Sequence, residues 1–581
     1  MRYIELVNFY DKIEATSSRI SMTYHLVDLF KRTPNNIIGK VVYLTEGRLY
    51  PNFVGIELGM AEKMALRALS MATGISQDKV ENEYKKKGDI GILSENLLKT
   101  RTQTTLFQRE LDVKDVYEDL DKIARTSGPG SADTKVRILS GLLTDASPKE
   151  AKYIMRIVTG KMRLGIADMT ILDALSKAFA GGRKDDVERI YNITSDLGEI
   201  AKTLSADGIE SIKEYHARAG RPIRMMLAQR MESAKDIIGK IGRAICEYKY
   251  DGERVQIHKN GNDIELFSRN LENITLQYPD VVKSAKANLK VREAIVEGEC
   301  VAVSPNTGDM LPFQELMHRR RKYGIEQKIE EFPTNIYLFD ALLIDGEDVI
   351  DIPLTKRRNI LKNSITETNE FKLSHALISE NTNDIEAFFE NAIQNGCEGL
   401  ILKGIDTTYQ AGARGWSWIK LKRSYQSKIV DPIDVVIVGA FIGRGRRSGN
   451  YGALLVAVYD HEKDTFPTIS KLGTGFTDEE LNDLPKILAP YRLEKRHSRV
   501  ESGFDADVWF EPKIVMETIG DELTLSPIHP CGYNKIRENA GIAIRFPRFT
   551  HNWRYDKSPE DATTVEEIVD MYNSQLKKIE R

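Results

Sequence analysis

A lysine within the run at 247–254 has the clearest chemical potential in this sequence, which reads Glu-Tyr-Lys-Tyr-Asp-Gly-Glu-Arg at that point. Lys249 ends a predicted strand and precedes an Asp-Gly pair that favours a hairpin turn. A lysine amine can attack an α-phosphate, but an unperturbed lysine is uncharged in only about one molecule in a few thousand at pH 7. A nucleophilic role therefore requires burial or nearby cations that lower its pKa. Alone the pattern is weak, because it arises by chance in about one chain in ten of this length and also fits a solvated lysine.

Six further motifs with charged or aromatic residues follow Lys249. In chain order they are Ser268-Arg269-Asn270, Glu297-Gly298-Glu299, Phe339-Asp340, Glu398-Gly399-Leu400-Ile401-Leu402-Lys403, Trp418-Ile419-Lys420-Leu421-Lys422 and Arg554-Tyr555-Asp556-Lys557. Phosphoryl transfer needs a nucleophile, neutralisation of charge and in-line positioning rather than an acid–base apparatus. The cations that can neutralise phosphate charge and lower the pKa of Lys249 are Arg254, Arg269, Lys420 and Lys422.

Two glutamates and a basic stretch add to this chemistry. Glu299 and Glu398 offer hard oxygen ligands for Mg²⁺ or hydrogen bonds to a ribose, although either alone is more often a solvated or salt-bridged carboxylate. The stretch 407–430 contains several basic residues and no acidic one, and the alternation of a strand places Lys420 and Lys422 on one face. A basic edge strand that discourages aggregation is the alternative. Together with the other motifs, the pattern favours phosphate contacts.

The elements that must position these residues change in type along the chain. The first third is helical: Ser147 can cap a helix that begins at Pro148 and ends at Gly160, and Asp168 can cap the next one. Short alternating runs with Asp-Gly and glycine-rich turns begin near residue 225, and strand-like runs typical of a small antiparallel barrel follow residue 425. We therefore expect domain boundaries near 225 and 429.

Composition excludes several classes of protein. The 581 residues suggest two to four domains, and 83 basic against 86 acidic residues give a net charge of −3, so a nucleic-acid surface requires local segregation of charge. A hydrophobic content of 41% predicts a folded chain. The four cysteines are dispersed as singles, which indicates neither a zinc ribbon nor a disulfide framework. No apolar run approaches a membrane span, so we expect a cytoplasmic protein without membrane contact.

The ordered motifs resemble those of the covalent nucleotidyltransferases, and the whole chain is similar to archaeal ATP-dependent DNA ligases of the replicative type. The loop Lys-Met-Arg-Leu-Gly-Ile-Ala-Asp at 161–168 is characteristic of their first domain. The resemblance implies an all-α DNA-binding domain over 1–224, an α+β adenylation domain over 225–428 and a β-barrel OB-fold domain over 429–581. It also implies sealing of single-strand nicks in duplex DNA during replication, repair and recombination.

By this resemblance Lys249 takes AMP from ATP with Mg²⁺ assistance, AMP passes to the 5′-phosphate at a nick, and the 3′-hydroxyl displaces it. Phe339 stacks on adenine, a use that suits a flat apolar ring, and Glu247 helps to recognise the base. Glu299 and Glu398 are the expected metal ligands. The remaining cofactor contacts are Arg254, Arg269, Glu299, Arg414, Lys420, Lys422, Arg554 and Lys557. The last motif, with Arg554, Asp556 and Lys557, orients the pyrophosphate, which implies a barrel that swings about a hinge at 428–431.

Expected partners are nicked DNA and a sliding clamp, and we expect a monomer. Lys161, Arg163 and the backbone at Gly165 lie on a loop between helices where phosphates can approach closely. A second flexible basic loop lies at 443–447. The sequence at 103–107 resembles a clamp-binding peptide through Gln103, Leu106 and Phe107. Equally, Leu106 and Phe107 could anchor a loop onto their own domain.

Other functions remain alternatives at this point. An RNA ligase or an mRNA-capping guanylyltransferase shares the lysine motifs but would not be expected to carry the large helical domain. An NAD-dependent ligase normally carries a four-cysteine zinc site, for which these cysteines are unsuited. A DNA-bridging scaffold without activity is disfavoured by retention of Lys249 and the later lysines.

Overall fold

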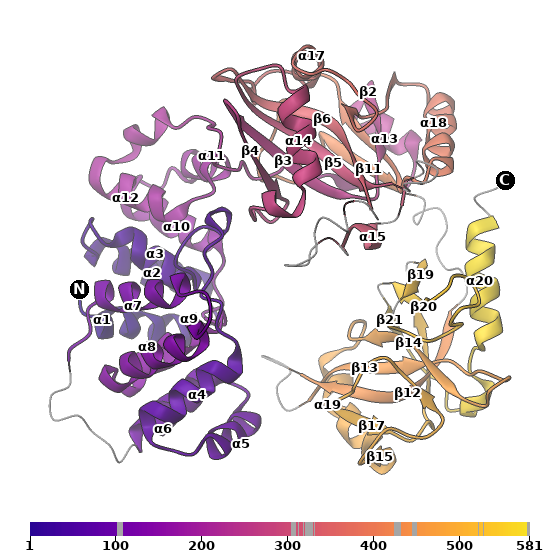
Figure 1. Cartoon of the computed structure of the whole chain (residues 1–581), viewed down its shortest axis with the longest axis horizontal. Coiled ribbons are helices and arrows are strands. Elements are labelled where there is room, and N and C mark those ends of the chain that lie inside the picture. Colours follow the sequence, from indigo (N-terminus) through magenta and orange to yellow (C-terminus); the bar gives the residue numbers. More distant parts are fainter. Residues whose placement is uncertain are drawn as a thin grey trace. The chain divides into compact units, whose positions relative to one another are not determined.

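The computed structural model describes residues 1–100, 109–303, 310–311, 313–317, 319, 329, 332–422, 432–443, 450–520, 522–526, 528–545 and 547–577. These residues form two compact units, 1–420 and 421–581, each described here by itself (Figure 1). Gln103, Leu106 and Phe107 lie outside the described residues, as do 428–431 and the basic part of the loop at 443–447. In the described part of the chain, no helix is long and apolar enough to cross a membrane.

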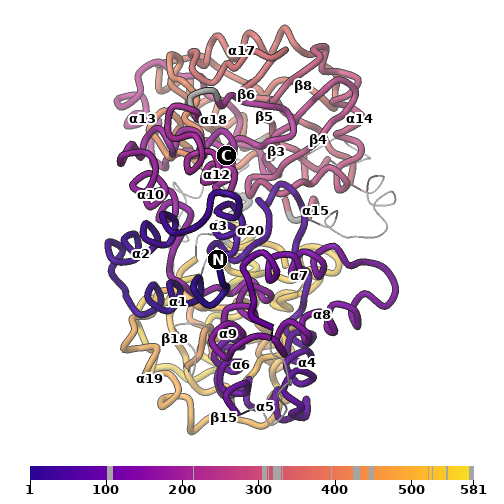
Figure 2. Tube along the Cα trace, turned by 90° about the vertical axis from the view of Figure 1, so that its left-hand side faces the viewer, coloured from indigo at the N-terminus to yellow at the C-terminus, as the bar shows by residue number. Residues whose placement is uncertain are grey.

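The first part of unit one is helical, as the sequence predicts. Its helices are α1 (Tyr3–Glu14), α2 (Arg19–Arg32), α3 (Ile38–Glu46), α4 (Glu62–Thr73), α5 (Gln77–Lys87), α6 (Ile90–Lys99), α7 (Val113–Arg125), α8 (Ser131–Asp145), α9 (Pro148–Val158), α10 (Asp168–Phe179), α11 (Lys184–Thr194) and α12 (Leu197–Asp207). Helix α7 shows why they pack: Val113, Val116, Leu120 and Ile123 recur at helical spacing and are buried in a shared core. Helices α2 and α10, distant in sequence, lie side by side (Figure 2).

The two helices that flank the loop at 159–167 begin differently from each other. Helix α9 has the predicted capping box, in which Ser147 and Glu150 each satisfy the other's backbone N–H. The predicted cap of α10 is wrong, because Ala167 is its N-cap and Asp168 makes no side-chain cap bond. Asp168 instead accepts a 2.5 Å hydrogen bond from Tyr191 and lies 3.3 Å from Arg224. Its carboxylate therefore ties the loop to the segment that enters the next domain.

Two sheets form the rest of unit one. The first has the order β1-β11-β10-β2-β9 and the second β4-β3-β5-β6-β7, with β8 paired to β6. The strands are β1 (Gln229–Arg230), β2 (Ala244–Lys249), β3 (Glu253–Asn260), β4 (Asp263–Ser268), β5 (Glu293–Ala302), β6 (Thr334–Ile344), β7 (Glu347–Asp348), β8 (Phe371–Leu373), β9 (Ala376–Ser379), β10 (Gly399–Gly404) and β11 (Trp418–Lys422). Helices α13 (Ala234–Ile241), α14 (Pro279–Asn288), α15 (Phe313–Met317), α17 (Leu354–Asn363) and α18 (Thr382–Gln394) accompany them (Figure 1).

The chain passes from the first sheet to the second directly after Lys249. The predicted hairpin is wrong, because β2 pairs with β9 and β10 whereas β3 pairs with β4 and β5. Gly252 is needed for close approach rather than for a turn: a β-carbon there would lie 2.3 Å from the carbonyl oxygen of Cys300. Lys249 consequently lies where the two sheets meet.

Unit two has a curled, mostly antiparallel eight-stranded sheet of the OB type and a separate two-stranded sheet formed by β19 and β20. Its strands are β12 (Ile433–Ile442), β13 (Tyr451–Ala457), β14 (Phe466–Leu472), β15 (Arg492–Leu493), β16 (Val500–Glu501), β17 (Val508–Phe510), β18 (Val515–Ile519), β19 (Glu522–Ser526), β20 (Gly541–Arg545) and β21 (Arg548–Trp553), with helices α19 (Asp478–Leu488) and α20 (Val565–Lys577). Strand β12 is central, because it pairs with β13, β17 and β18. Register shifts within the β12–β13 pair curve the sheet, and its inner face is buried.

We predict that Gly252→Ala destabilises the protein by about 1–3 kcal/mol, because the added methyl group overlaps the Cys300 backbone. Gly239→Ala is the matched control, since a β-carbon there meets nothing within 4 Å and alanine is the better helix former. Thermal unfolding of both variants measures the difference. Equal melting temperatures for Gly252→Ala and the unchanged protein would show that this contact imposes no constraint.

Candidate active site

Lys249 lies among carboxylates. Its carbonyl oxygen accepts a 2.8 Å hydrogen bond from the Glu398 backbone N–H, and its Nζ lies 2.5 Å from Oε2 of Glu398. Burial lowers the pKa of Lys249, but the charges of Glu398, Glu299 and Asp251 outweigh burial and raise it above its usual value. Contrary to the expectation from the sequence, the charged groups that act most strongly on this amine are carboxylates rather than cations. The ammonium form is stabilised here, so attack requires a change in local charge.

The carboxylates around Lys249 crowd one another. Burial raises the pKa of Glu299 to about 7, although Lys249 and Arg254 oppose the shift. Burial also raises the pKa of Asp251, and the charge of Glu398 adds to that shift. Asp251 accepts a hydrogen bond from the Phe313 backbone N–H at 3.2 Å. Such a group attracts a cation, because an added positive charge relieves the repulsion between the carboxylates.

Arg254 is held rigidly beside this group. It stands opposite Glu299 in the β3–β5 register, donates to the Met226 carbonyl at 2.7 Å and binds Glu297 at 2.8 Å. Burial lowers the pKa of Arg254, but Glu297 and Tyr409 raise it above its usual value. Glu297 is fully buried and also accepts a hydrogen bond from Tyr409 at 3.0 Å. The motif contained Glu297, but the sequence suggested no role for it. A signal was present, because side chains two residues apart on a strand, such as Glu297 and Glu299, point to the same face.

Aromatic rings and cations form one wall of the site. Phe339 on β6 and Trp418 on β11 meet edge to face at 6.1 Å between ring centroids. Nζ of Lys403 lies 4.4 Å from the Phe339 centroid and 4.2 Å from that of Trp418, and the Arg254 guanidinium lies 5.3 Å from Phe339. Cations over aromatic faces fix the rings in place. The arrangement suits a flat base beside Phe339, and Trp418 is a contributor that the motif contained without an assigned role.

Glu247 is a buried anion with two cationic partners. Lys403 lies 2.6 Å from its Oε2, and Arg358 binds its other oxygen. Burial lowers the pKa of Lys403, whereas Glu247 raises it, and the net direction is downward. Arg358 was not identified from the sequence, because a basic residue within a helix carries no distinguishing pattern. Glu247 thus lies on the same strand as Lys249, with its carboxylate paired to Lys403 and Arg358.

The other predicted cofactor cations lie at the edges of these sheets. Lys420 and Lys422 are half-buried on β11, and Arg414 is exposed in the preceding loop. Arg269 is exposed at the end of β4 and lines a separate cavity of about 390 Å³ together with Arg48 and Arg224. Arg254 thus lies beside the carboxylates around Lys249, whereas Arg269 faces the helical part.

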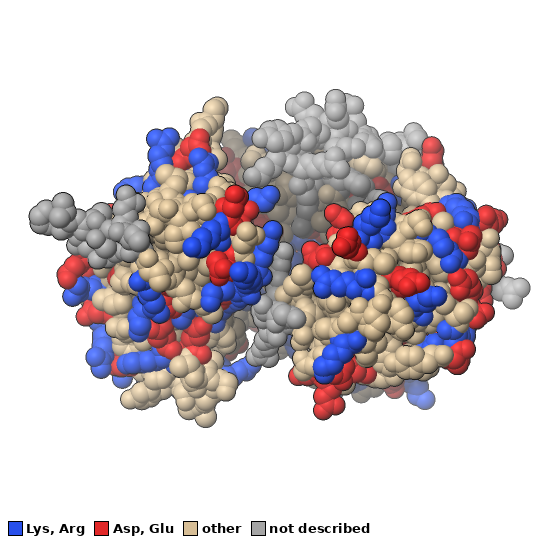
Figure 3. All heavy atoms as spheres, turned by 90° about the horizontal axis from the view of Figure 1, so that it is seen from below, with Lys and Arg blue, Asp and Glu red and all other residues tan. Residues whose placement is uncertain are grey.

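The predicted DNA-binding cations are ion-paired in the helical part. Lys161 lies 2.9 Å from Glu62, and Arg163 binds Asp89 at 2.8 Å and the Gly88 carbonyl at 3.1 Å. Arg163 adopts φ 57° and Gly165 φ 72°. Basic and acidic side chains alternate over the surface seen in Figure 3. The structure thus gives Arg163 a structural partner and leaves the backbone at Gly165 exposed.

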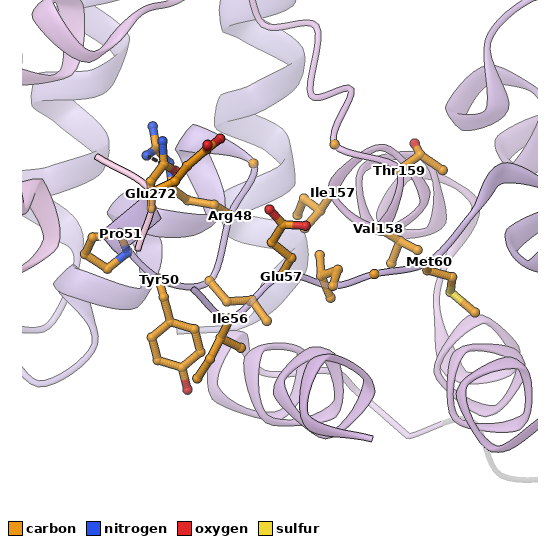
Figure 4. Close-up of a pocket in the computed structure, with 16 residues that line it drawn as sticks. Arg48, Tyr50, Pro51, Ile56, Glu57, Met60, Ile157, Val158, Thr159 and Glu272 are labelled. Carbon is orange, nitrogen blue, oxygen red and sulfur yellow. Dashed lines mark hydrogen bonds between the residues drawn. The ribbon is translucent and has the colours of Figure 1, made fainter. Parts of the chain in front are cut away.

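A cavity of about 410 Å³ lies next to this loop. Residues 47–52, 56–60 and 157–160 line it together with Glu272, and Figure 4 shows Arg48, Tyr50, Glu57 and Thr159 around it. Backbone of Gly47, Gly59 and Gly160 forms part of its wall. Glu272 belongs to the loop after β4, so this cavity joins the helical part to the second sheet of unit one.

In unit two, the two predicted pyrophosphate contacts share one partner. Nη1 of Arg554 lies 2.8 Å and Nζ of Lys557 2.7 Å from Oδ2 of Asp434. Arg554 also binds Asp556 at 2.9 Å. Asp434 was not identified from the sequence, because it lies 120 residues before Arg554 within an ordinary strand pattern.

No preformed metal cage surrounds Lys249 in the described residues. Among all the described residues, the one group of three whose ligand atoms lie within 4.8 Å of one another is Asp460, Glu462 and Glu566, which belongs to unit two. Lys535 already binds Glu462 and Glu566. Mg²⁺ commonly takes one or two carboxylates and completes its shell with water and substrate phosphates. Glu299 and Glu398, both close enough to Lys249 to raise its pKa, are the candidate carboxylates for such an ion.

Comparison with known proteins identifies the family. Three family models match: DNA ligase N terminus over residues 2–176, ATP dependent DNA ligase domain over 225–422 and ATP dependent DNA ligase C terminal region over 447–557. The chain is 54% identical to DNA ligase 2 of Thermofilum pendens, covering 99% of this chain and 98% of that protein. Identity to DNA ligase 2 of Korarchaeum cryptofilum is 51%, with 100% and 98% coverage. A solved structure described as Pmar-Lig_Pre. shares the fold, with a TM-score of 0.54 at 16% identity over 95% of this chain and 99% of that chain.

The chain belongs to the ATP-dependent DNA ligases, and its similarity is to the archaeal enzymes of that family. The family resemblance inferred from the motifs is confirmed, as is the multidomain architecture of helical, adenylation and OB-type parts. Its activity is the ATP-dependent sealing of nicks in duplex DNA. Membership of this family excludes the RNA ligase, capping-enzyme and scaffold alternatives. The exact domain boundaries and the roles of single residues stay predictions.

We predict that Glu398→Gln lowers the pKa of Lys249, because Glu398 is the strongest of the charges that raise it. Competitive acetylation at a series of pH values, read by peptide mass spectrometry, reports the titration of this amine. Glu390→Gln, an exposed glutamate on α18, is the control and should leave the titration unchanged. An identical titration in Glu398→Gln would contradict the assigned charge balance.

Proposed function

We propose that Lys249 is the residue that carries AMP between ATP and DNA. The observation that supports this most is the position of its Nζ, 2.5 Å from Glu398 at the meeting of two sheets, with Glu299 and Arg254 beside it. Phe339 and Trp418, which meet edge to face, would bind a base, and the carboxylates near the amine would hold a metal. The same lysine is the first of the ordered motifs that indicate the family.

The first step is transfer of AMP to the amine. A bond forms between Nζ of Lys249 and the α-phosphorus of ATP, while the bond from that phosphorus to the bridging oxygen breaks and pyrophosphate leaves with the electron pair. The ammonium must first lose a proton, and Glu398 is the nearest carboxylate that could accept it. Bound Mg²⁺ would supply positive charge that stabilises the developing phosphate charge. Glu299 and Glu398 would hold it.

The surrounding residues bind and orient the nucleotide. Phe339 stacks on adenine, and Glu247 contacts the base from its position beside Lys403. Glu299 and the cations contact the ribose and phosphates; those cations are Arg254, Arg269, Arg414, Lys420 and Lys422. Arg554 and Lys557 orient the pyrophosphate and act in this first step. In the later steps AMP moves to the 5′-phosphate of the nick, and the 3′-hydroxyl attacks that phosphate and releases AMP.

DNA contacts are proposed for the loop at 159–167. The exposed backbone at Gly165 and the side chains of Lys161 and Arg163 would contact phosphates. We propose a cytoplasmic monomer with domains over 1–224, 225–428 and 429–581 that acts in replication, repair and recombination. Binding of a sliding clamp through Gln103, Leu106 and Phe107 remains part of the proposal.

Replacing Lys249 tests the central assignment. Lys249→Ala removes the nucleophile, and Lys249→Arg keeps a charge that cannot be lost, so both variants should fail to retain α-labelled AMP after denaturation. Binding of nicked DNA should persist, because the loop at 159–167 is unchanged. Lys286→Ala, an exposed lysine on α14, is the control and should label normally. Retention of AMP by Lys249→Ala would reject the assignment.

The DNA contacts predict a salt dependence. Removal of one phosphate contact should reduce the slope of log affinity against log salt by about 0.9 in magnitude. We expect this change in both Lys161→Ala and Arg163→Ala, whereas a lower melting temperature is expected mainly for Arg163→Ala because Asp89 is then deprived of a partner. An unchanged slope in the double variant would place the DNA contacts elsewhere.

A further inference from the structure

Two cations of unit two converge on a single carboxylate. Arg554 Nη1 lies 3.1 Å from Oδ1 and 2.8 Å from Oδ2 of Asp434, and Lys557 Nζ lies 2.7 Å from the same Oδ2. The Asp434 side chain is 10% exposed, whereas those of Arg554 and Lys557 are 23% and 31% exposed. The carboxylate is therefore the inner member of the cluster, and the two cations are its outer, accessible members.

The backbone on both sides of this cluster is fixed by hydrogen bonds. Asp434 donates its N–H to Thr563 Oγ1 and accepts from the Thr563 N–H, both at 3.0 Å. The Arg554 N–H donates to the Val515 carbonyl at 3.0 Å, and the Lys557 N–H donates to the Arg554 carbonyl at 3.1 Å. Because β12 lies at the centre of the sheet, Asp434 cannot move without disturbing its pairing with β18.

The bonding to Asp434 leaves both cations able to bind another anion. A guanidinium has five N–H donors and an ammonium has three, and Asp434 uses the Nη1 edge of Arg554 and one donor of Lys557. The Asp556 carboxylate takes the other edge of Arg554 through Nε and Nη2, so an anion gains that edge only by displacing Asp556, whose side chain is 65% exposed. Without Asp434, two positive charges on a four-residue turn would repel each other and separate.

We propose that Asp434 is a positioning residue for the AMP-transfer step, which holds Arg554 and Lys557 together as a preformed site for the β- and γ-phosphates of ATP. This inference rests on the proposed role of Arg554 and Lys557 in that step. Asp434 touches neither ATP nor DNA: it acts through the two cations by fixing their separation and direction. Its loss should therefore affect transfer of AMP to Lys249 and spare the joining of DNA that already carries AMP.

Single-turnover kinetics of Asp434→Asn test this proposal. AMP transfer from ATP should slow by about 10- to 100-fold, the range that corresponds to loss of one hydrogen-bonded charge partner. Joining of a pre-adenylated nick should stay close to that of the unchanged enzyme. Asp483→Asn, which breaks an exposed ion pair with Lys486, is the matched control and should leave both steps unchanged. Asp434→Glu keeps the charge and should recover part of the AMP transfer.

Three results would overturn the inference: normal AMP transfer in Asp434→Asn, equal slowing of both steps, or no recovery in Asp434→Glu. Should Asp434→Asn not fold, Asp434→Glu decides alone, because a displaced carboxylate should slow AMP transfer selectively. Arg554→Ala separates this inference from the proposal beneath it. Normal AMP transfer in Arg554→Ala would reject the role of the cation itself, whereas a selective defect in Arg554→Ala with a normal Asp434→Asn rejects the role of Asp434 only.

Discussion

The ion pair between Lys249 and Glu398 is the interaction on which the rest of this structure depends. Strand β2 ends at Lys249, and β10 begins beside it, so the pair joins neighbouring strands of one sheet just where the chain crosses to the other. Gly252 permits that crossing by letting the chain approach Cys300 closely. The fold therefore places one amine among a group of carboxylates, and the charge of those carboxylates raises the pKa of the amine above its usual value.

The same principle recurs at the other functional cations. Several other cations near the proposed sites have a carboxylate partner in the described residues, because a buried or half-buried charge without a partner is costly. The pairs are Lys249 with Glu398, Arg254 with Glu297, Lys403 with Glu247, Arg163 with Asp89, and Arg554 and Lys557 with Asp434. Because the net charge is −3, a polyanion must be bound by local groups of basic residues rather than by a positive potential over the whole protein.

Much of this could be predicted from the sequence, and the limits have physical reasons. Residue type and local spacing predict some functional and structural residues, as they do for Lys249 and for the capping pair Ser147 and Glu150. Partners that come from distant strands do not, which is why Asp434 emerged only from the structure. Asp168 shows a second limit, since local cap propensity yields when a tertiary partner binds the same carboxylate. The crossing at Gly252 shows a third limit. An Asp-Gly pair between two strands predicts a hairpin, but the pair does not reveal which sheet the second strand joins.

The central claim is that the amine of Lys249 receives AMP, and peptide mapping of the ATP-treated enzyme tests it most directly. The protein would be incubated with ATP and Mg²⁺, digested under alkaline conditions that preserve a phosphoramidate, and sequenced by mass spectrometry. We expect that AMP lies on Nζ of Lys249 and that adding nicked DNA removes it. AMP on another residue, or AMP on Lys249 that nicked DNA does not discharge, would contradict this claim.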